Sequence, residues 1–127
     1  AAAFAIENWP TPIVFSGFEI GNKIMTGKRL AALPLSSPVR RAYELYNGVT
    51  DRQSWDQTAV LYAAQGLQGG LQEMWDLHTK GHLHVNQDGS NEWRGSPDKE
   101  HAYLVEKMAP QKIADVIEVR MMHQPAK

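Results

Sequence analysis

The distribution of hydrophobic and polar residues predicts a series of short elements. Pro12–Gly17 (PIVFSG) is almost wholly apolar and ends in Ser-Gly, which predicts a strand covered on both faces, as in a parallel sheet. In the following segment, Ile20, Ile24 and Met25 recur at helical spacing as far as Gly27, a residue that often ends a helix. The pattern therefore predicts a strand followed by a helix.

Two further helices have clear start and stop signals. Ser37 can cap a helix, Pro38 suits its first position, and Asn47-Gly48 can end it. The next helix is expected over Trp55–Gln65, ended by Gly66. Its central residues are apolar on every face, which predicts a helix buried on all sides.

The pattern changes after residue 81. His82–Gly95 predicts a β-hairpin with Asp88-Gly89 in its turn, and His101–Met108 predicts another strand. Pro110 sits near the start of a last helix, in which apolar residues recur every three or four positions. The order of elements indicates an α/β fold with too few strands for a complete doubly wound sheet.

The chain has 127 residues, the size of one ordinary domain. Its first ten residues, AAAFAIENWP, resemble the last turns of a helix, so we expect the chain to start inside a larger fold. This stretch is not a secretion signal because it has no basic start, and Glu7 and Asn8 interrupt its apolar part. No apolar run is long enough to cross a bilayer, so no membrane partner is expected. The sequence does not indicate the cellular compartment of the protein.

Charge and cysteine content exclude several classes of function. With 13 basic and 14 acidic residues, the net charge is −1, and no basic stripe indicates a nucleic-acid surface. The chain has no cysteine, which excludes disulfides, thiolate catalysis and cysteine-bound zinc.

Asp56 is the main candidate for chemistry, and two interpretations stay open. Ser54 and Gln57 have the spacing of a capping box, and a carboxylate in a first turn favours the helix dipole. If the helix is buried, however, its first turn is partly buried too, and a carboxylate there must be hydrogen-bonded, paired or bound to a cation. Asp56 beside Trp55 is then a ligand site.

Histidines offer a second candidate. His82 and His84 face the same way on a strand, and with His78 they could form a transition-metal site. No third ligand lies at a diagnostic spacing, so the pattern favours strand histidines with a partly exposed face over a metal site.

Several segments together resemble one enzyme family. WPTPIVFSGFEIGNKIMTG, SSPVRRAYELYNG, SWDQTAVLYAAQGL and HAYLVEKMAP are similar, in this order, to the C-terminal part of the inosine-uridine-preferring nucleoside hydrolases, in particular a bacterial branch. The resemblance implies that residues 1–127 are a single-domain fragment, the C-terminal part of a nucleoside hydrolase fold. That fold is α/β and Rossmann-like with a mostly parallel sheet, here helix-rich and with a β-hairpin.

The resemblance also implies a function. Family members hydrolyse the N-glycosidic bond of ribonucleosides with the help of calcium, and Asp56 matches an aspartate that binds this calcium. Trp55 would contact the substrate base. The expected partners are a nucleoside or ribosyl ligand and either the missing N-terminal half or a second copy.

Departures from the family leave a second hypothesis open. Trp55 replaces a histidine that assists departure of the base, and Phe18-Glu19-Ile20-Gly21 replaces Leu-Asp-Val-Thr. The family's Asp-rich N-terminal motif is absent from this sequence, so no catalytic base is assigned and the chain alone is expected to be inactive. The alternative is a non-catalytic α/β binding or structural module that keeps the scaffold without the chemistry.

Overall fold

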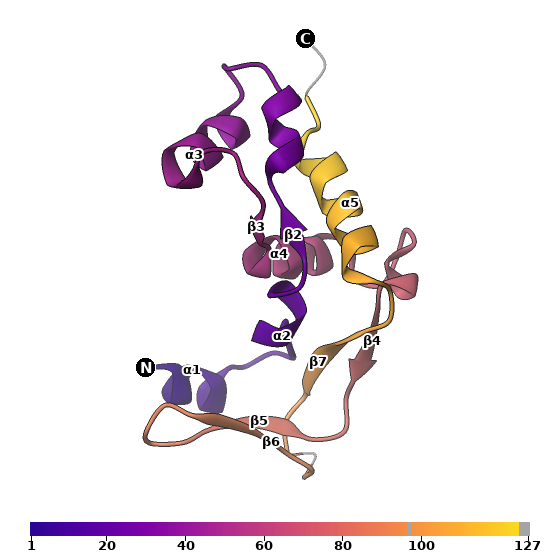
Figure 1. Cartoon of the computed structure of the whole chain (residues 1–127). Helices are drawn as coiled ribbons and strands as arrows, with labels where there is room; N and C mark the ends of the chain where they lie inside the picture. The colour runs from indigo at the N-terminus through magenta and orange to yellow at the C-terminus, as the bar shows by residue number, and fades with distance from the viewer. Residues whose placement is uncertain (97, 125–127) are drawn as a thin grey trace.

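The computed structural model describes residues 1–96 and 98–124. Short helices and strands follow one another along the chain, and Figure 1 shows their arrangement. In order, they are α1 (Ala2–Asn8), β1 (Ile13–Phe15), α2 (Phe18–Gly21), β2 (Met25–Thr26), the 3-10 helix η1 (Lys28–Ala32), α3 (Pro38–Asn47), β3 (Arg52–Gln53), α4 (Trp55–Gln65), the 3-10 helix η2 (Leu71–Glu73), β4 (Trp75–His78), β5 (His82–Val85), β6 (Asn91–Arg94), β7 (His101–Glu106) and α5 (Pro110–Met121).

The strands of the described residues form three small sheets. One has three strands in the order β1-β7-β4, and the other two are the pairs β2-β3 and β5-β6. β1 pairs with β7 in parallel, whereas the β4-β7, β2-β3 and β5-β6 pairs are antiparallel. The prediction of a Rossmann-like, mostly parallel sheet is therefore wrong.

The connection between β4 and β7 explains this difference. Parallel neighbours need a crossover, usually a helix, between consecutive strands. Here the β5-β6 hairpin lies between β4 and β7, and β7 returns antiparallel to β4 with Leu77 opposite Leu104. Figure 1 shows the hairpin at one end of the molecule beside α1, and α3 at the other end.

The elements with strong local signals are confirmed. Ser37 caps α3, since its Oγ accepts from the backbone N–H of Arg40, and Gly48 ends that helix in the left-handed conformation. The hairpin turns where expected, with Asp88 Oδ1 accepting from the backbone N–H of Ser90. β7 and α5 also lie where the pattern placed them.

Several segments differ from the prediction. The helix expected as far as Gly27 stops at Gly21, because the chain then extends into β2 and pairs with β3. β1 was expected to be covered on both faces, but Val14 is 36% exposed and the strand is at the edge of its sheet. β4, which the pattern did not identify, occupies the other edge.

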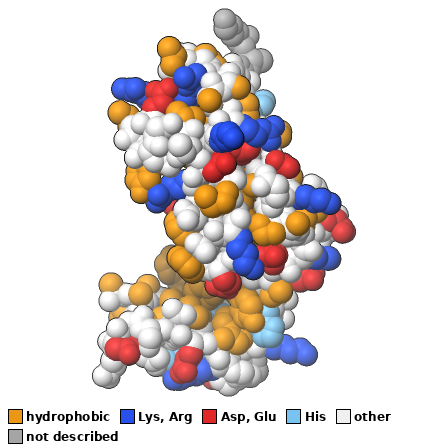
Figure 2. All heavy atoms as spheres, in the orientation of Figure 1, with side chains coloured by type: hydrophobic (Ala, Val, Ile, Leu, Met, Phe, Trp, Pro, Cys, Tyr) orange, Lys and Arg blue, Asp and Glu red, His pale blue; other side chains and the backbone are white. Residues whose placement is uncertain are grey.

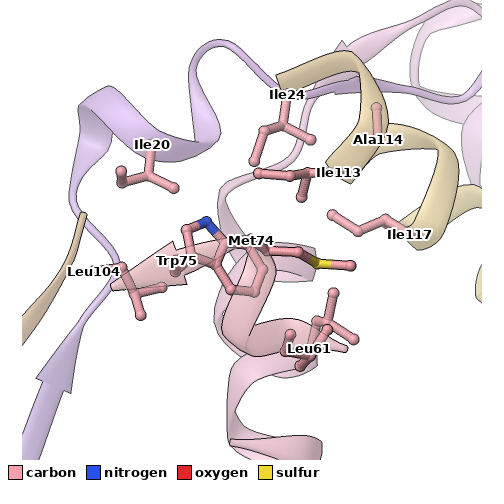
Figure 3. Close-up of a cluster of buried hydrophobic side chains, with 10 residues drawn as sticks. Ile20, Ile24, Leu61, Met74, Trp75, Leu104, Ile113, Ala114 and Ile117 are labelled. Atoms are coloured by element: carbon pink, nitrogen blue, oxygen red, sulfur yellow. The ribbon is translucent and has the colours of Figure 1, made fainter. Parts of the chain in front are cut away.

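One hydrophobic core joins the helices to the three-stranded sheet. Its buried members come from α2 and the turn after it, α4, η2, β4, β7 and α5, and they are Ile20, Ile24, Leu61, Leu71, Met74, Trp75, Leu104, Ile113, Ala114 and Ile117. Figure 3 shows the Trp75 indole among these side chains, facing the α5 residues Ile113 and Ile117. α5 therefore covers the core residues that α2 and the turn after it contribute.

The surface keeps a considerable number of large hydrophobic side chains. Phe4, Trp9, Phe18 and Val60 are each more than half exposed. In Figure 2, hydrophobic side chains gather in the lower half of the view, while charged side chains are frequent in the upper half. Within the described ranges, no helix combines the length and apolarity needed to cross a membrane.

Candidate functional site

Trp55 and Asp56 are the first two residues of α4 and lie close to α2. Two residues, Ser16 and Gly17, separate the carboxyl end of β1 from the start of α2. The carboxyl ends of strands, followed by helix N-termini, are where open α/β sheets bind ligands. The two predicted site residues therefore lie near such a position on the one parallel pair of described strands.

The Trp55 indole is held against α2. It stacks on the Phe18 ring with centroids 5.4 Å apart and an interplanar angle of 27°, and its Nε1 donates to the Phe18 carbonyl oxygen at 3.1 Å. The ring is half-buried. Because indole has a single N–H, this hydrogen bond uses the donor of Trp55, and the remaining exposed ring can only contribute a surface for packing.

Gly21 allows α2 and α4 to approach closely. A Cβ atom added at Gly21 would lie 2.5 Å from the Trp55 Cα and 2.6 Å from its ring. The position of Trp55 therefore depends on Phe18 and Gly21. In the sequence, these two residues were only departures from a family motif. Sequence reasoning missed this contact because 37 residues separate Phe18 from Trp55.

The expected capping box at the start of α4 does not form. Ser54 is the N-cap residue, but its side chain makes no capping hydrogen bond. Its Oγ instead lies 2.6 Å from Thr26 Oγ1, and the Gln57 side chain donates to Tyr43 OH at 3.0 Å. Both members of the predicted box are therefore engaged with residues of other elements.

Asp56 is exposed at the rim of a groove between α4 and α5. The groove has a volume of about 390 Å³, an apolar floor that includes Leu61 and Ile117, and Arg120 in its wall. Arg120 donates to the Gln65 side chain at 2.8 Å. Within residues 1–96 and 98–124, Asp56 has no hydrogen-bonding or ion-pairing side chain, so its carboxylate oxygens are open to solvent or a ligand.

α4 is less buried than its composition predicts. Thr58 and Leu61 are its buried residues, whereas Val60 is 65% exposed. The helix packs with one side on the core and leaves apolar residues on the other side uncovered. The prediction of a partly buried first turn is therefore wrong: Asp56 is exposed, and burial does not require a partner for its carboxylate.

The histidines do not gather around one point. His78 stacks on Tyr103, with centroids 4.8 Å apart, and its Nε2 contacts the Lys80 carbonyl oxygen. His82 is buried and its Nδ1 lies 2.7 Å from the Ser96 carbonyl oxygen. In the part of the chain that the structure describes, no three His, Asp or Glu side chains are grouped as a metal site requires.

His101 has no role assigned from the sequence, and the structure buries it where β7 meets the β5-β6 hairpin. It is 5% exposed, and its Nδ1 accepts from the backbone N–H of Leu83 at 3.2 Å. Burial lowers the pKa of His101, and the nearby charges of Lys99 and His82 lower it further. The neutral imidazole therefore serves as a structural acceptor at the junction of β7 and the hairpin.

Comparison of the chain with protein-family models, with curated proteins and with solved structures finds no match in any of the three.

Proposed function

We propose that this chain forms part of a nucleoside N-ribohydrolase-like protein and supplies one calcium ligand, Asp56, and one wall of the sugar site, with Trp55 in contact with the substrate base. The observation that carries the proposal is the open Asp56 carboxylate in the first turn of α4, beside an indole fixed on α2. The resemblance of SWDQTAVLYAAQGL to the family supports Asp56, whereas Trp55 stands where the family usually has a histidine.

Asp56 fits calcium as one ligand of several. Calcium takes six to eight oxygen ligands, and carboxylates are prominent among them. The described residues hold no cluster that would complete this number, so the other ligands would come from another segment or a second copy. When bound, calcium in such a site would hold ribose hydroxyls and a water molecule whose pKa it lowers.

The chemistry of this chain's own residues limits what it does alone. Hydrolysis forms a bond from water oxygen to the anomeric carbon, breaks the bond from that carbon to the base nitrogen, and needs a base for the water proton. The leaving base also takes up a proton. Trp55 does not supply it, because its Nε1–H is bound to the Phe18 carbonyl oxygen. The isolated chain is therefore expected to bind a nucleoside without hydrolysing it.

Hydrolysis by the isolated chain is the first test. The purified chain is incubated with inosine or uridine and calcium, and free base is measured by chromatography. We expect none above the rate in buffer. Calcium-dependent release of base would show that a complete catalytic set is present and would contradict the assignment of this chain as a partial site.

Binding is the second test. We expect calcium together with inosine to shift the backbone amide signals of Trp55 and Asp56 in NMR spectra, and Asp56→Asn to abolish the shifts. Asp98→Asn is the matched control, since Asp98 is also exposed but lies three residues before the start of β7. Shifts that persist unchanged in Asp56→Asn would refute the role of Asp56.

The alternative is a non-catalytic binding or structural module. It is favoured by Trp55, which stands at the family's proton-donor position with its only donor already engaged. Nucleoside binding that is unaffected by calcium removal with a chelator would favour this alternative over the hydrolase.

A further inference from the structure

A polar hollow lies at the amino ends of β1 and β7, whereas Trp55 and Asp56 lie near the carboxyl end of β1. The hollow has a volume of about 320 Å³ and is lined by Glu7 and Trp9 at the end of α1 and by residues 98–101 before and at the start of β7. Lys99 joins the two sides, since its Nζ lies 3.0 Å from Glu7 Oε2 and donates to the Glu7 carbonyl oxygen at 2.6 Å. The fold therefore holds the two walls of this hollow together.

His101 is the buried residue of this lining, with 5% of its surface exposed. Its Nδ1 accepts from the Leu83 backbone N–H, and a neutral imidazole with this hydrogen bond carries its proton on Nε2. Burial lowers the pKa of His101, which keeps the ring neutral near pH 7. Within residues 1–96 and 98–124, the Nε2–H has no hydrogen-bond acceptor. Buried donors are normally paired, so this one is available to a ligand in the hollow.

Trp9 provides an apolar surface in the same lining. Its side chain is 59% exposed, and its Nε1 donates to Thr11 Oγ1 at 3.0 Å. This hydrogen bond uses the single donor of the indole, and the exposed ring is left for packing against a ligand.

Carboxylates outnumber cations around the hollow. Glu7, Asp98 and Glu100 line it together with one ammonium group, that of Lys99. The hydrogen bond from Lys99 and its charge lower the pKa of Glu7, so this carboxylate is ionised and accepts hydrogen bonds. The lining therefore combines several acceptors with the single neutral donor of His101.

We propose that this hollow binds a saccharide ring, which stacks its C–H face on Trp9, donates hydroxyl groups to the carboxylates and accepts from His101 Nε2–H. Sugar hydroxyls both donate and accept, so one ring can satisfy both kinds of group in the lining. The excess of carboxylates disfavours an anionic ligand, and a quaternary ammonium ion has no acceptor for the His101 donor. The proposal uses neither Asp56 nor a bound cation and goes beyond the proposed function.

The test is an NMR titration of the ¹⁵N-labelled full chain with the methyl pyranosides of glucose, galactose and mannose. We expect at least one of them to shift the Trp9 indole signal and the His101 Nε2–H signal, and to slow exchange of this proton with water. Glycerol, which has hydroxyl groups but no ring face, should cause neither change. Trp9→Ala should weaken the binding about tenfold, as truncation of an aromatic contact commonly does. Phe4→Ala is the matched control, since Phe4 is 74% exposed on α1 and does not line the hollow.

The outcomes separate this proposal from its alternatives. If none of the three glycosides shifts either signal of the wild type, the proposal is overturned, whether or not the variants fold. Equal affinity of folded Trp9→Ala and Phe4→Ala would overturn it too. Tetramethylammonium is titrated in parallel, and shifts caused by this ion alone would identify a cation site instead of a saccharide site. The signals of Trp55 and Asp56 report on the proposed function and are read separately.

Discussion

The Trp55 indole and the Phe18 ring are stacked at 5.4 Å, and the same indole donates its N–H to the Phe18 carbonyl oxygen. One side chain thereby joins the start of α4 to the start of α2 by both a stacking contact and a hydrogen bond. The two helix starts near the carboxyl end of β1 are held as one unit.

Trp55→Phe separates the two contacts. Phenylalanine can keep the stacking on Phe18 but leaves its carbonyl oxygen without the indole donor. We expect the free energy of unfolding to fall by about 1 kcal/mol, the usual contribution of one hydrogen bond. Urea denaturation followed by circular dichroism measures it, and an unchanged midpoint would mean that the hydrogen bond contributes nothing.

Gly21→Ala tests the close approach of α2 and α4. The new Cβ would stand 2.5 Å from the Trp55 Cα, so the two helices must separate. We expect a loss of about 1–3 kcal/mol, as for other overpacked sites. Gly95→Ala is the matched control, because nothing lies near a Cβ atom added at Gly95. Equal stability of the two variants would contradict the predicted clash.

α4 should respond very differently to truncation on its two sides. Leu61 is 5% exposed and belongs to the core, so Leu61→Ala should cost about 2–4 kcal/mol. Val60, one residue earlier and 65% exposed, should change stability by less than about 0.5 kcal/mol when replaced by alanine. A large loss in Val60→Ala would show that the apolar outer side of α4 is covered in solution.

Acid should destabilise the fold through His101. Its pKa is lowered in the folded protein, first by burial and then by Lys99 and His82, with Glu7 acting weakly in the opposite direction. The unfolded chain therefore takes up the proton more readily, and stability falls as the pH drops below the ordinary value of about 6.5. Thermal unfolding between pH 8 and pH 5 measures this, and His101→Gln should flatten the curve. An unaltered pH dependence in that variant would assign the effect to other groups.

Local signals explain which elements the sequence predicts well. The caps of α3 and the Asp88-Gly89 turn depend on residues a few positions apart, so their pattern is visible in the sequence. β2 and β3 contain two residues each and exist only because they pair with one another. No hydrophobic period can indicate strands of that length.

The candidate site shows the same limit. The sequence identifies Trp55 and Asp56 as neighbours at a helix start, and the structure places them there. It cannot show that Thr26, 28 residues earlier, takes the Ser54 hydroxyl away from its expected cap. Tertiary packing decides whether a side chain hydrogen-bonds to a local partner or to a distant one. It also decides that Val60, in the apolar centre of α4, is exposed.

The hydrogen bond from the Gly27 N–H to Glu118 Oε1 spans 91 positions of the chain. It fastens α5 to the end of β2, and α5 also supplies Ile113, Ala114 and Ile117 to the core. The apolar residues of α2 and of the turn after it are therefore covered only once α5 has packed on them. Proteins with many such distant contacts fold on the scale of about milliseconds to seconds rather than microseconds. We expect slow, cooperative refolding in which α2, β2 and α5 become protected from solvent together.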